Sequence, residues 1–479
     1  MKQLNYLRLT SFIFITFIMT FDGYSQEGKE LYKLHCAQCH GNQLEGGNGA
    51  SFRDGIWRYG LQKGAIVRNV KFGIMDVGMP SFEAILDDEK ISSVIDYILS
   101  YEKELGITAT LPEILTTQEY ELSVQTVAEG LDVPWGISFI DERTALITEK
   151  NGKIFFLIDD KIQDEAVANT PKVLNDGQGG LLDIAVDPDY AKNGWIYLAY
   201  SHDLEKIEQG QKNSGAMTRI VRGKIVNNEW TKQEVLFEAP HEKYRTTRHH
   251  YGSRIVFDPD GYLYFSIGDR GSQDMAQEVI YPNGKIHRIH KDGSIPKDNP
   301  FVKTKGAIPS IYSYGHRNPQ GISVHPVTGR VWNSEHGPMG GDELNLVKKG
   351  ANYGWPVITY GMNYDGTPIT NITAKEGMEQ PVLHWTPSIA VCGIEFYKGD
   401  LMSKWNNNLF VGALKYQQLA RVVIEDNKVV KEEVILRGHG RIRDVGVSPN
   451  GALYVVSNMP SKILKLTPSN GAKEVESAR

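Results

Sequence analysis

Two histidines and an aspartate bracket a strand–turn–strand pattern in the stretch HHYGSRIVFDPDGYLYFSIGDR. The runs IVF and YLYFSI have the β-branched and aromatic residues of strands, and the intervening DPDG is a turn sequence. Because an antiparallel hairpin brings its outer ends together, His249 and His250 should lie near Asp269. A histidine oriented by a carboxylate can act as a general base. Arg254 and Arg270 add two cations to the same edge.

The same strand–turn–strand pattern occurs six times between Trp135 and the C-terminus. Each copy is too small to bury its own faces, and a spacing of roughly 45 to 75 residues is in the range of propeller blades. We therefore predict an all-β six-bladed β-propeller, and the alternative is a β-sandwich with long loops. The copies begin near Trp135, Leu181, Arg254, Gly321, Gly393 and Val445.

Polar residues gather at one end of these hairpins, opposite the turns. One face of the propeller should therefore collect a histidine, carboxylates, several cations and two amides. Before the first strands come Gln178, His250, Arg317, Asn318, Arg441 and Arg443. After the second strands come Glu149, Asp269, Glu335, Gly337, Pro338 and Lys415.

The cations of this face indicate a polyanionic ligand. Arg317, Lys415, Arg441 and Arg443 come from separate segments, and guanidinium groups pair well with carboxylates and phosphates. The chain as a whole has a net charge of -6, which makes the local excess more telling and argues against a nucleic-acid surface. The segment EHGPMGGDELN offers carboxylates and backbone carbonyls of the kind that bind Ca²⁺.

A second chemistry lies near the N-terminus, where Cys36-Ala37-Gln38-Cys39-His40 is the attachment signature of c-type haem. Both thiols bond to the porphyrin and His40 ligates the iron. The alternatives, a redox CxxC pair or half a zinc site, lack a thioredoxin-like context and a second cysteine pair. The loop FGIMDVGMPSF and the helical run ISSVIDYILSYEKEL resemble class I cytochromes c. That resemblance favours Met79 over Met75 as the second iron ligand.

These features divide the chain of 479 residues into a signal peptide, two domains and a linker. Lys2 and Arg8 supply positive charge before a short apolar run from Phe12 to Phe21, which is the pattern of an export signal. We expect cleavage near Ser25 and a periplasmic or otherwise exported protein. The alternative is an uncleaved anchor. Cys392 lies in the apolar run IAVCGIEF and is expected to be a small buried side chain, and the count of three cysteines excludes a disulfide framework. The expected boundaries are a signal peptide over 1–25, a small all-α cytochrome c domain over 27–105, a linker over 106–118 and the propeller over 119–470.

A base, a polyanion site, a hard cation and a haem together suggest dehydrogenation with a quinone cofactor. From Val133 to Thr467 the chain resembles the soluble pyrroloquinoline quinone (PQQ)-dependent glucose and aldose sugar dehydrogenases, which are six-bladed propellers. The resemblance is carried by GQGGLLDIAVDPDY, HHYGSRIVFDPDGYLYFSIGDRG, GHRNPQG, EHGPMGGDELNLVKKGANYGWP and GRIRDV. Asp183 and the HHYG run are closer to the aldose branch, and the loops that would contact the sugar are poorly matched.

The resemblance implies a role for each matching residue. His250 would be the general base, Asp269 would orient it, and Arg317 would polarise the quinone. Gln178 would lie beside the sugar in the cofactor pocket. The cofactor contacts would be Asn318, Lys415, Arg441 and Arg443. The carbonyls of Gly337 and Pro338 would hold Ca²⁺ against PQQ, and Asp342, Glu343 and Tyr353 would form a structural calcium site.

The sequence therefore predicts a quinohaemoprotein that oxidises aldose sugars with PQQ, Ca²⁺ and haem c and then reduces a downstream redox protein. No membrane span is expected after removal of the signal peptide. One alternative is a haem-d nitrite reductase, against which the GPMGGDE segment and the cation set argue. The other is a sugar-binding propeller without turnover, which predicts the loss of His250, Arg317 or Lys415, yet all three are present.

Overall fold

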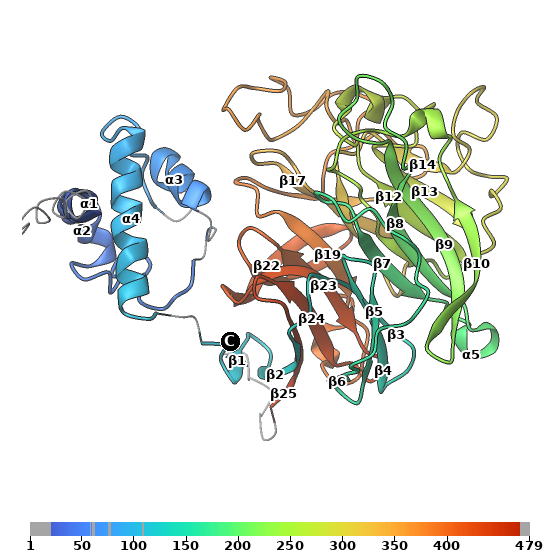
Figure 1. Ribbon diagram of the computed structural model, residues 1–479, viewed down its shortest axis with the longest axis horizontal. Helices are drawn as coiled ribbons and strands as arrows, with labels where there is room; N and C mark the ends of the chain where they lie inside the picture. Colours follow the sequence, from blue (N-terminus) through green and yellow to red (C-terminus); the bar gives the residue numbers. More distant parts are fainter. Residues whose placement is uncertain (1–20, 58, 60–62, 75–77, 108–109, 470–479) are drawn as a thin grey trace, which may run out of the picture. The chain divides into compact units, whose positions relative to one another are not determined.

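The chain forms two compact units, residues 1–110 and 111–479 (Figure 1). Met75 and most of the expected signal peptide lie outside the residues that the structure describes. Within the described residues, no helix is long and apolar enough to cross a membrane. The computed structural model describes residues 21–57, 59, 63–74, 78–107 and 110–469.

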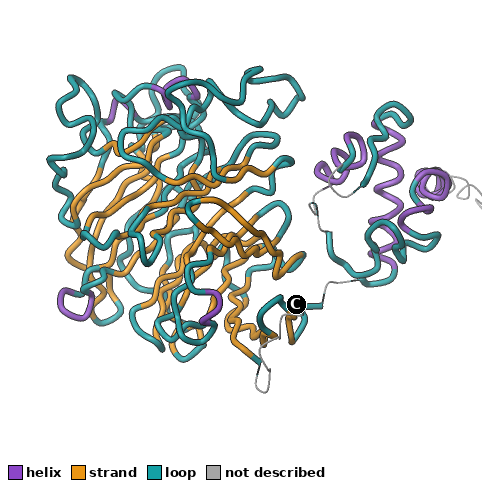
Figure 2. The backbone as a smooth tube through the Cα atoms, turned by 180° about the vertical axis from the view of Figure 1, so that it is seen from behind, coloured by secondary structure: helices purple, strands orange, loops and turns teal. Residues whose placement is uncertain are grey.

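The smaller unit is helical, as Figure 2 shows, and confirms the all-α domain predicted from the sequence. Its longest helix, α4, begins after the cap residue Asp87, whose side chain accepts a hydrogen bond from Lys90 N at 2.8 Å. Helices α1 and α4 pack closely at Gly28, where a Cβ atom would lie 2.0 Å from the Ser93 carbonyl oxygen. The helices are α1 (Phe21–His35), α2 (Ala37–His40), α3 (Lys63–Phe72) and α4 (Asp88–Glu104).

The larger unit consists of six antiparallel sheets, which confirms the six-bladed propeller. Blades one to three contain β3 (Pro134–Phe139), β4 (Thr144–Glu149), β5 (Ile154–Ile158), β6 (Lys161–Ile162), β7 (Leu181–Val186), β8 (Ile196–Asp203), β9 (Ala216–Val226), β10 (Glu229–Phe237), β11 (Ile255–Phe257), β12 (Tyr262–Ile267), β13 (Lys285–His290) and β14 (Ile311–Tyr314). Blades four and five contain β15 (Pro319–Val324), β16 (Val331–Glu335), β17 (Asp342–Leu346), β18 (Leu383–Trp385), β19 (Val391–Phe396), β20 (Leu409–Ala413), β21 (Gln418–Glu425) and β22 (Lys428–Arg437). Short helices in the connections are α5 (Tyr190–Asn193), η2 (His241–Lys243), η3 (Gln273–Gln277) and η4 (Ser403–Trp405).

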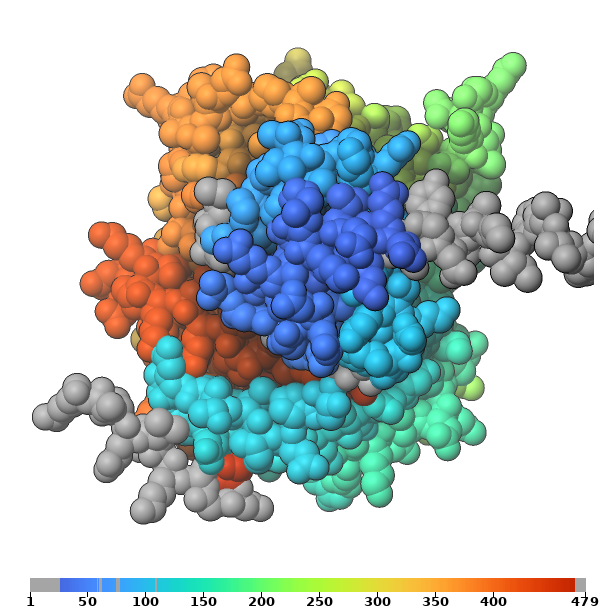
Figure 3. Space-filling view, turned by 90° about the vertical axis from the view of Figure 1, so that its left-hand side faces the viewer, coloured from blue at the N-terminus to red at the C-terminus, as the bar shows by residue number. Residues whose placement is uncertain are grey.

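The sixth blade joins the two ends of the propeller chain. Its strands are β23 (Arg441–Val447), β24 (Leu453–Asn458), β25 (Lys462–Pro468), β2 (Glu121–Glu129) and β1 (Ile114–Thr116). Strand β2 pairs with β25, and Figure 3 shows cyan residues of the N-terminal part against the red C-terminal strands. The innermost strands β3, β7, β11, β15, β19 and β23 contact one another in a closed ring. Each predicted hairpin supplies the two innermost strands of a blade.

Arg254 lies at the centre of this ring, although the sequence placed it among the cations of the site edge. Its Nη1 is 2.9 Å from Asp183 Oδ1 and 3.0 Å from Asp444 Oδ2. Its Nε donates to the Gln320 carbonyl at 2.9 Å, and its Nη2 donates to the Arg443 carbonyl at 2.5 Å. These contacts join the innermost strands of blades two, four and six to the residue that precedes β11.

The two carboxylates of this buried cluster also bind backbone groups. Asp183 Oδ2 accepts from Ile255 N at 2.8 Å, and Asp444 Oδ2 accepts from Ile137 N at 3.1 Å. On the side of the hairpin turns, the cluster forms part of the wall of a cavity of about 1030 Å³. The buried cluster therefore lies on the propeller axis, between the face that carries the hairpin turns and the opposite face. It joins the innermost strands of several blades there.

Replacing Arg254 by methionine should destabilise the propeller by about 3–5 kcal/mol, because Asp183 and Asp444 would stay buried without their cation. The measurement is the free energy of unfolding in urea. Arg143→Met is the control, since its ion pair with Asp159 is exposed (75% and 48% for the two side chains) and should contribute less than about 1 kcal/mol. Equal small losses in both variants would contradict the buried-pair account.

Candidate active site

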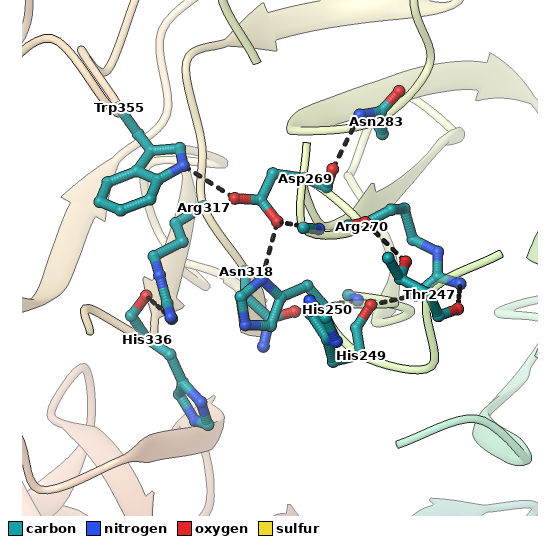
Figure 4. Close-up of polar contacts among 12 residues, drawn as sticks. Thr247, His249, His250, Asp269, Arg270, Asn283, Arg317, Asn318, His336 and Trp355 are labelled. Atoms are coloured by element: carbon teal, nitrogen blue, oxygen red, sulfur yellow. Dashed lines mark hydrogen bonds and ion pairs between the residues drawn. The ribbon is translucent and has the colours of Figure 1, made fainter. Parts of the chain in front are cut away.

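His250 and Asp269 meet at one end of the β11–β12 hairpin. The two strands pair with Ile255 opposite Phe265, so the chain returns from β12 to the level of the residues before β11. His250 Nδ1 and Asp269 Oδ1 are 2.7 Å apart (Figure 4). The two side chains are 15% and 1% exposed. The hairpin pattern therefore assembles an acid–base pair that is almost shielded from water.

The charges of this pair follow from its surroundings. Burial lowers the pKa of His250 to about 4, against the opposing effect of the bond to Asp269. Burial alone would raise the pKa of Asp269, but His250 and Arg317 hold that pKa below its ordinary value. With Asp269 ionised, His250 carries its proton on Nδ1 and presents Nε2 as an acceptor. The arrangement suits a general base at neutral pH.

The His250 backbone is held in a conformation that non-glycine residues rarely adopt, with φ at 56°. Gln178 Oε1 accepts from His250 N at 2.8 Å. The Arg270 guanidinium donates to the Thr247 carbonyl at 2.7 Å and also to the His249 carbonyl. Backbone strain of this kind persists only where surrounding contacts over-determine it. Gln178 and Arg270 therefore hold the loop that carries the base.

Trp355 also contacts the pair, which sequence reasoning missed. Its Nε1 donates to Asp269 Oδ2 at 2.8 Å, while Gly271 N donates to Oδ1 at 2.8 Å. The Arg317 guanidinium lies 5.4 Å from the centre of the indole ring. A single tryptophan in a glycine-rich loop has no spacing that relates it to Asp269, so only its place in the matched segment GANYGWP was a signal.

Arg317 is hydrogen-bonded to Asp269 through its backbone and is 6% exposed. Its Nη1 donates to the carbonyls of His336 and Gly337 at 3.1 and 2.9 Å. Its backbone N–H donates to Glu335 Oε2 at 2.7 Å, and its carbonyl accepts from Asp269 N at 2.7 Å. Two carbonyl oxygens therefore hold the Arg317 guanidinium, and the Arg317 backbone is hydrogen-bonded to both Glu335 and Asp269.

Several buried polar atoms around this cluster lack a protein partner. Among the described residues, Arg317 Nε, Arg443 Nε and His336 Nε2 make no hydrogen bond. Burial lowers the pKa of Arg443 to about 10, and the guanidinium lies 4.1 Å from the centre of the Trp135 ring. Arg441 is partly buried, and burial lowers its pKa as well. Buried cations with unsatisfied donors fit a polar anionic ligand, such as a polycarboxylate, and do not fit an apolar one.

The other residues expected at this face have mixed surroundings. Asn318 Oδ1 accepts from Gly252 N at 3.2 Å, so Asn318 braces the histidine loop. Lys415 follows β20 and is partly buried. Glu149 accepts from Asp132 N at 2.6 Å and supports a loop of blade one. The sequence pattern thus identified the right strand ends but did not show which side chains serve the fold.

The segment after β16 offers backbone oxygens for a hard cation. Gly337 O faces the Arg317 guanidinium, and a Cβ atom on Gly337 would lie 2.2 Å from Gly340 O and 2.3 Å from Gly341 O. The backbone is therefore tightly turned here, and backbone carbonyls are ligands of the kind that Ca²⁺ accepts. The described residues contain no group of three or more His, Cys, Asp or Glu side chains that could hold a metal ion. A calcium ion at Gly337 and Pro338 would therefore depend on backbone carbonyls.

The structural calcium site expected at Asp342, Glu343 and Tyr353 stays a prediction, and the three side chains make hydrogen bonds within the protein. Asp342 Oδ1 accepts from Gly337 N and Ser388 Oγ at 2.9 and 2.5 Å, and Oδ2 accepts from Val391 N at 3.1 Å. The Tyr353 hydroxyl donates to Leu346 O and accepts from Lys348 N. Glu343 accepts from Asn345 Nδ2 at 3.1 Å, and burial holds its pKa well above the ordinary value. The first and third side chains organise loops.

The haem signature lies on α2 and the residues that flank it. His40 Nδ1 is 2.8 Å from the Ala50 carbonyl oxygen, a contact that places the proton on Nδ1 and leaves Nε2 available to a metal. Cys36 is partly buried and Cys39 is exposed, and both thiols are free. Met79 packs against the apolar core of the small unit and forms a β-bridge with Ile74. These groups fit a covalently attached haem, with Met79 as the methionine among the described residues of the loop.

Comparisons with known proteins match each unit separately. The family model described as glucose/sorbosone dehydrogenase matches residues 131–465, and the model for the cbb3-type cytochrome c oxidase subunit III matches residues 25–98. The aldose sugar dehydrogenase YliI of Escherichia coli is 38% identical over 73% of this chain and 94% of its own length. The structure of the E. coli soluble aldose sugar dehydrogenase in its apo form is similar with a TM-score of 0.67 and 36% identity, covering 73% of this chain and all of that one. The PQQ-bound aldose sugar dehydrogenase of Streptomyces coelicolor is similar with a TM-score of 0.58 and 28% identity, covering 73% and 98% of the two chains.

The His250 ring should stay neutral down to about pH 4, because burial outweighs the attraction of Asp269. Nitrogen-15 NMR of labelled histidine measures this titration directly. Between the ordinary pKa near 6.5 and about 4, the unfolded chain binds a proton that the folded chain does not, so this group's contribution to stability is lost as pH falls through that range. A ring that titrates near pH 6.5 would show that water reaches the pair.

Proposed function

The chain belongs to the glucose/sorbosone dehydrogenase family, and we propose that it oxidises aldose sugars at the anomeric carbon to lactones with PQQ and reduces its own haem c. The observation that carries this proposal is the shielded His250–Asp269 pair beside Arg317, with unpartnered buried cation atoms around it. The similar proteins include aldose sugar dehydrogenases, one of them in a PQQ-bound form, and this similarity supports the same substrate and cofactor.

The residues of this chain would share the work in the following way. When bound, PQQ supplies the carbonyl that accepts the hydride from the sugar. His250 Nε2 takes the proton of the anomeric hydroxyl, while Asp269 keeps Nδ1 protonated and stabilises the resulting imidazolium. Arg317 is held by His336 and Gly337 so that its remaining donors can stabilise negative charge on an oxygen. The pair is shielded from water, which strengthens each of these interactions.

The remaining residues would bind and orient. The cofactor carboxylates would pair with Lys415, Arg441 and Arg443, and Asn318 would hold the loop against the cofactor. Gln178, which fixes the His250 backbone, would border the sugar. We also propose Ca²⁺ at the carbonyls of Gly337 and Pro338, as the resemblance to the PQQ-dependent dehydrogenases implies.

The helical unit would carry the electrons onward. The sugar loses two electrons and two protons, whereas one haem accepts a single electron, so two successive transfers complete each turnover. Cys36 and Cys39 would attach the haem, and His40 and Met79 would ligate its iron; a His/Met pair raises the haem potential and favours acceptance of electrons. We also propose export through a signal peptide over 1–25, because haem attachment of this kind suits that compartment, and a downstream redox protein as the final acceptor.

Adding an aldose to the protein loaded with PQQ and Ca²⁺ should reduce the haem, seen as growth of the reduced haem band in anaerobic stopped flow. The His250→Gln variant removes the base and should slow this reduction by roughly 100- to 10,000-fold. Arg143→Gln, on the exposed surface, is the matched control and should keep the wild-type rate. Absence of haem reduction with every aldose tested would refute the proposed function.

A double Cys36→Ser, Cys39→Ser variant should lose the covalent haem and with it the internal acceptor. Sugar oxidation should then proceed only with an added soluble dye, because the propeller has its own core and closes without the helical unit. The pyridine haemochrome spectrum reports the haem, and dye bleaching reports turnover. Loss of dye reduction in a folded variant would mean that the haem unit is part of the oxidising site.

A further inference from the structure

We propose that Trp355 is a positioning residue, which holds Asp269 in the orientation that the base His250 requires. This inference rests on the proposed function and deepens it. The evidence is the hydrogen bond of 2.8 Å from Trp355 Nε1 to Asp269 Oδ2. Figure 4 shows the indole contacting one carboxylate oxygen of Asp269 while His250 contacts the other.

The contact is the sole protein donor to that oxygen among the described residues. Asp269 Oδ1 receives two donors, His250 Nδ1 at 2.7 Å and Gly271 N at 2.8 Å, whereas Oδ2 receives Trp355 alone. Asp269 is fully buried, so water does not replace a lost donor. Without the indole N–H, a buried carboxylate oxygen would have no partner, and the carboxylate would be free to rotate away from His250.

The backbone of Trp355 is anchored by two hydrogen bonds. Trp355 N donates to Gly315 O at 2.9 Å, and its carbonyl accepts from Gln277 Nε2 at 2.7 Å. Gly315 follows β14 and Gln277 ends η3, so both anchors belong to the segments around blade three, which also carries the base. The loop after β17 thus places an N–H group against the hairpin of the preceding blade.

Burial alone does not explain the direction of this N–H group. Trp332, on β16, is equally buried, yet its Nε1 has no hydrogen-bond partner among the described residues. The fold therefore tolerates a buried tryptophan whose indole N–H makes no hydrogen bond. The hydrogen bond from Trp355 to Asp269 is thus a specific contact and not a general consequence of burial. Trp332 also provides a matched control, because Trp332→Phe removes an N–H group that makes no contact.

The charged groups that face His250 define the expected sign. They are Asp269, which raises its pKa, and Arg317 and His249, which lower it; His336 also lies close to His250. Trp355→Phe keeps the ring against Arg317 and removes only the donor, so Asp269 should lose its orientation toward His250 and the pKa of His250 should fall.

The test measures His250 by nitrogen-15 NMR in the full chain without added cofactor, and steady-state kinetics in the protein loaded with PQQ and Ca²⁺. We expect Trp355→Phe to lower the His250 titration midpoint, to lower kcat by about 10- to 100-fold and to move the acid limb of kcat to lower pH, with KM and PQQ affinity within about two-fold. Trp332→Phe should change none of these. An unmoved His250 titration, or a loss of PQQ affinity that parallels the loss of activity, would overturn the proposal.

If the Trp355→Phe variant does not fold, a second measurement tests the same contact without it. In the wild-type chain, the Trp355 indole proton should shift when Asp269 is replaced by asparagine, while the Trp332 indole proton should not. An unmoved Trp355 signal would overturn the assignment. If the wild type oxidises no aldose, the proposed function fails, but the His250 and indole signals still decide the role of Trp355.

Discussion

At the propeller axis, Arg254 places a full positive charge where water cannot neutralise it, and Asp183 and Asp444 supply the neutralising charges. A buried ion pair contributes little net stability, but breaking one is costly, so such a pair specifies arrangement more than it adds strength. Here it ties the innermost strands of several blades to one residue. His250 lies four residues before Arg254, and the position of the base therefore follows from the position of the axis.

The site is built outward from that fixed point. The loop that precedes Arg254 has a strained backbone at His250, and hydrogen bonds with Gln178 and Arg270 restrain this loop. Asp269 then receives donors from its own hairpin and from the loop after β17. Each blade contributes an ordinary β-hairpin, and the chemistry arises because the closed ring brings the ends of several hairpins to one face.

Local patterns were enough to predict the fold and the identity of most candidate residues. Alternating strand patterns with DPDG-type turns located the two inner strands of every blade, and the return of a hairpin placed Asp269 beside His250. Such patterns do not show which way a long side chain points. Arg254 and Arg270 both lie at the predicted end of the hairpin. Arg254 pairs with buried carboxylates on the propeller axis, whereas Arg270 donates to backbone carbonyls of the histidine loop. Trp355 of blade four contacts Asp269 of the adjacent blade three, and this contact is set by the closure of the propeller and not by any spacing in the chain.

The pairing of β2 with β25 has a consequence for the order in which the protein matures. The helical unit is complete as soon as its own residues have been synthesised, whereas the sixth blade lacks partners until the last strand of the chain is available. Long-range β pairing of this kind forms late. The helical unit can therefore fold while the propeller is still an open ring, so the two units reach their folded states in the order in which they occur along the chain.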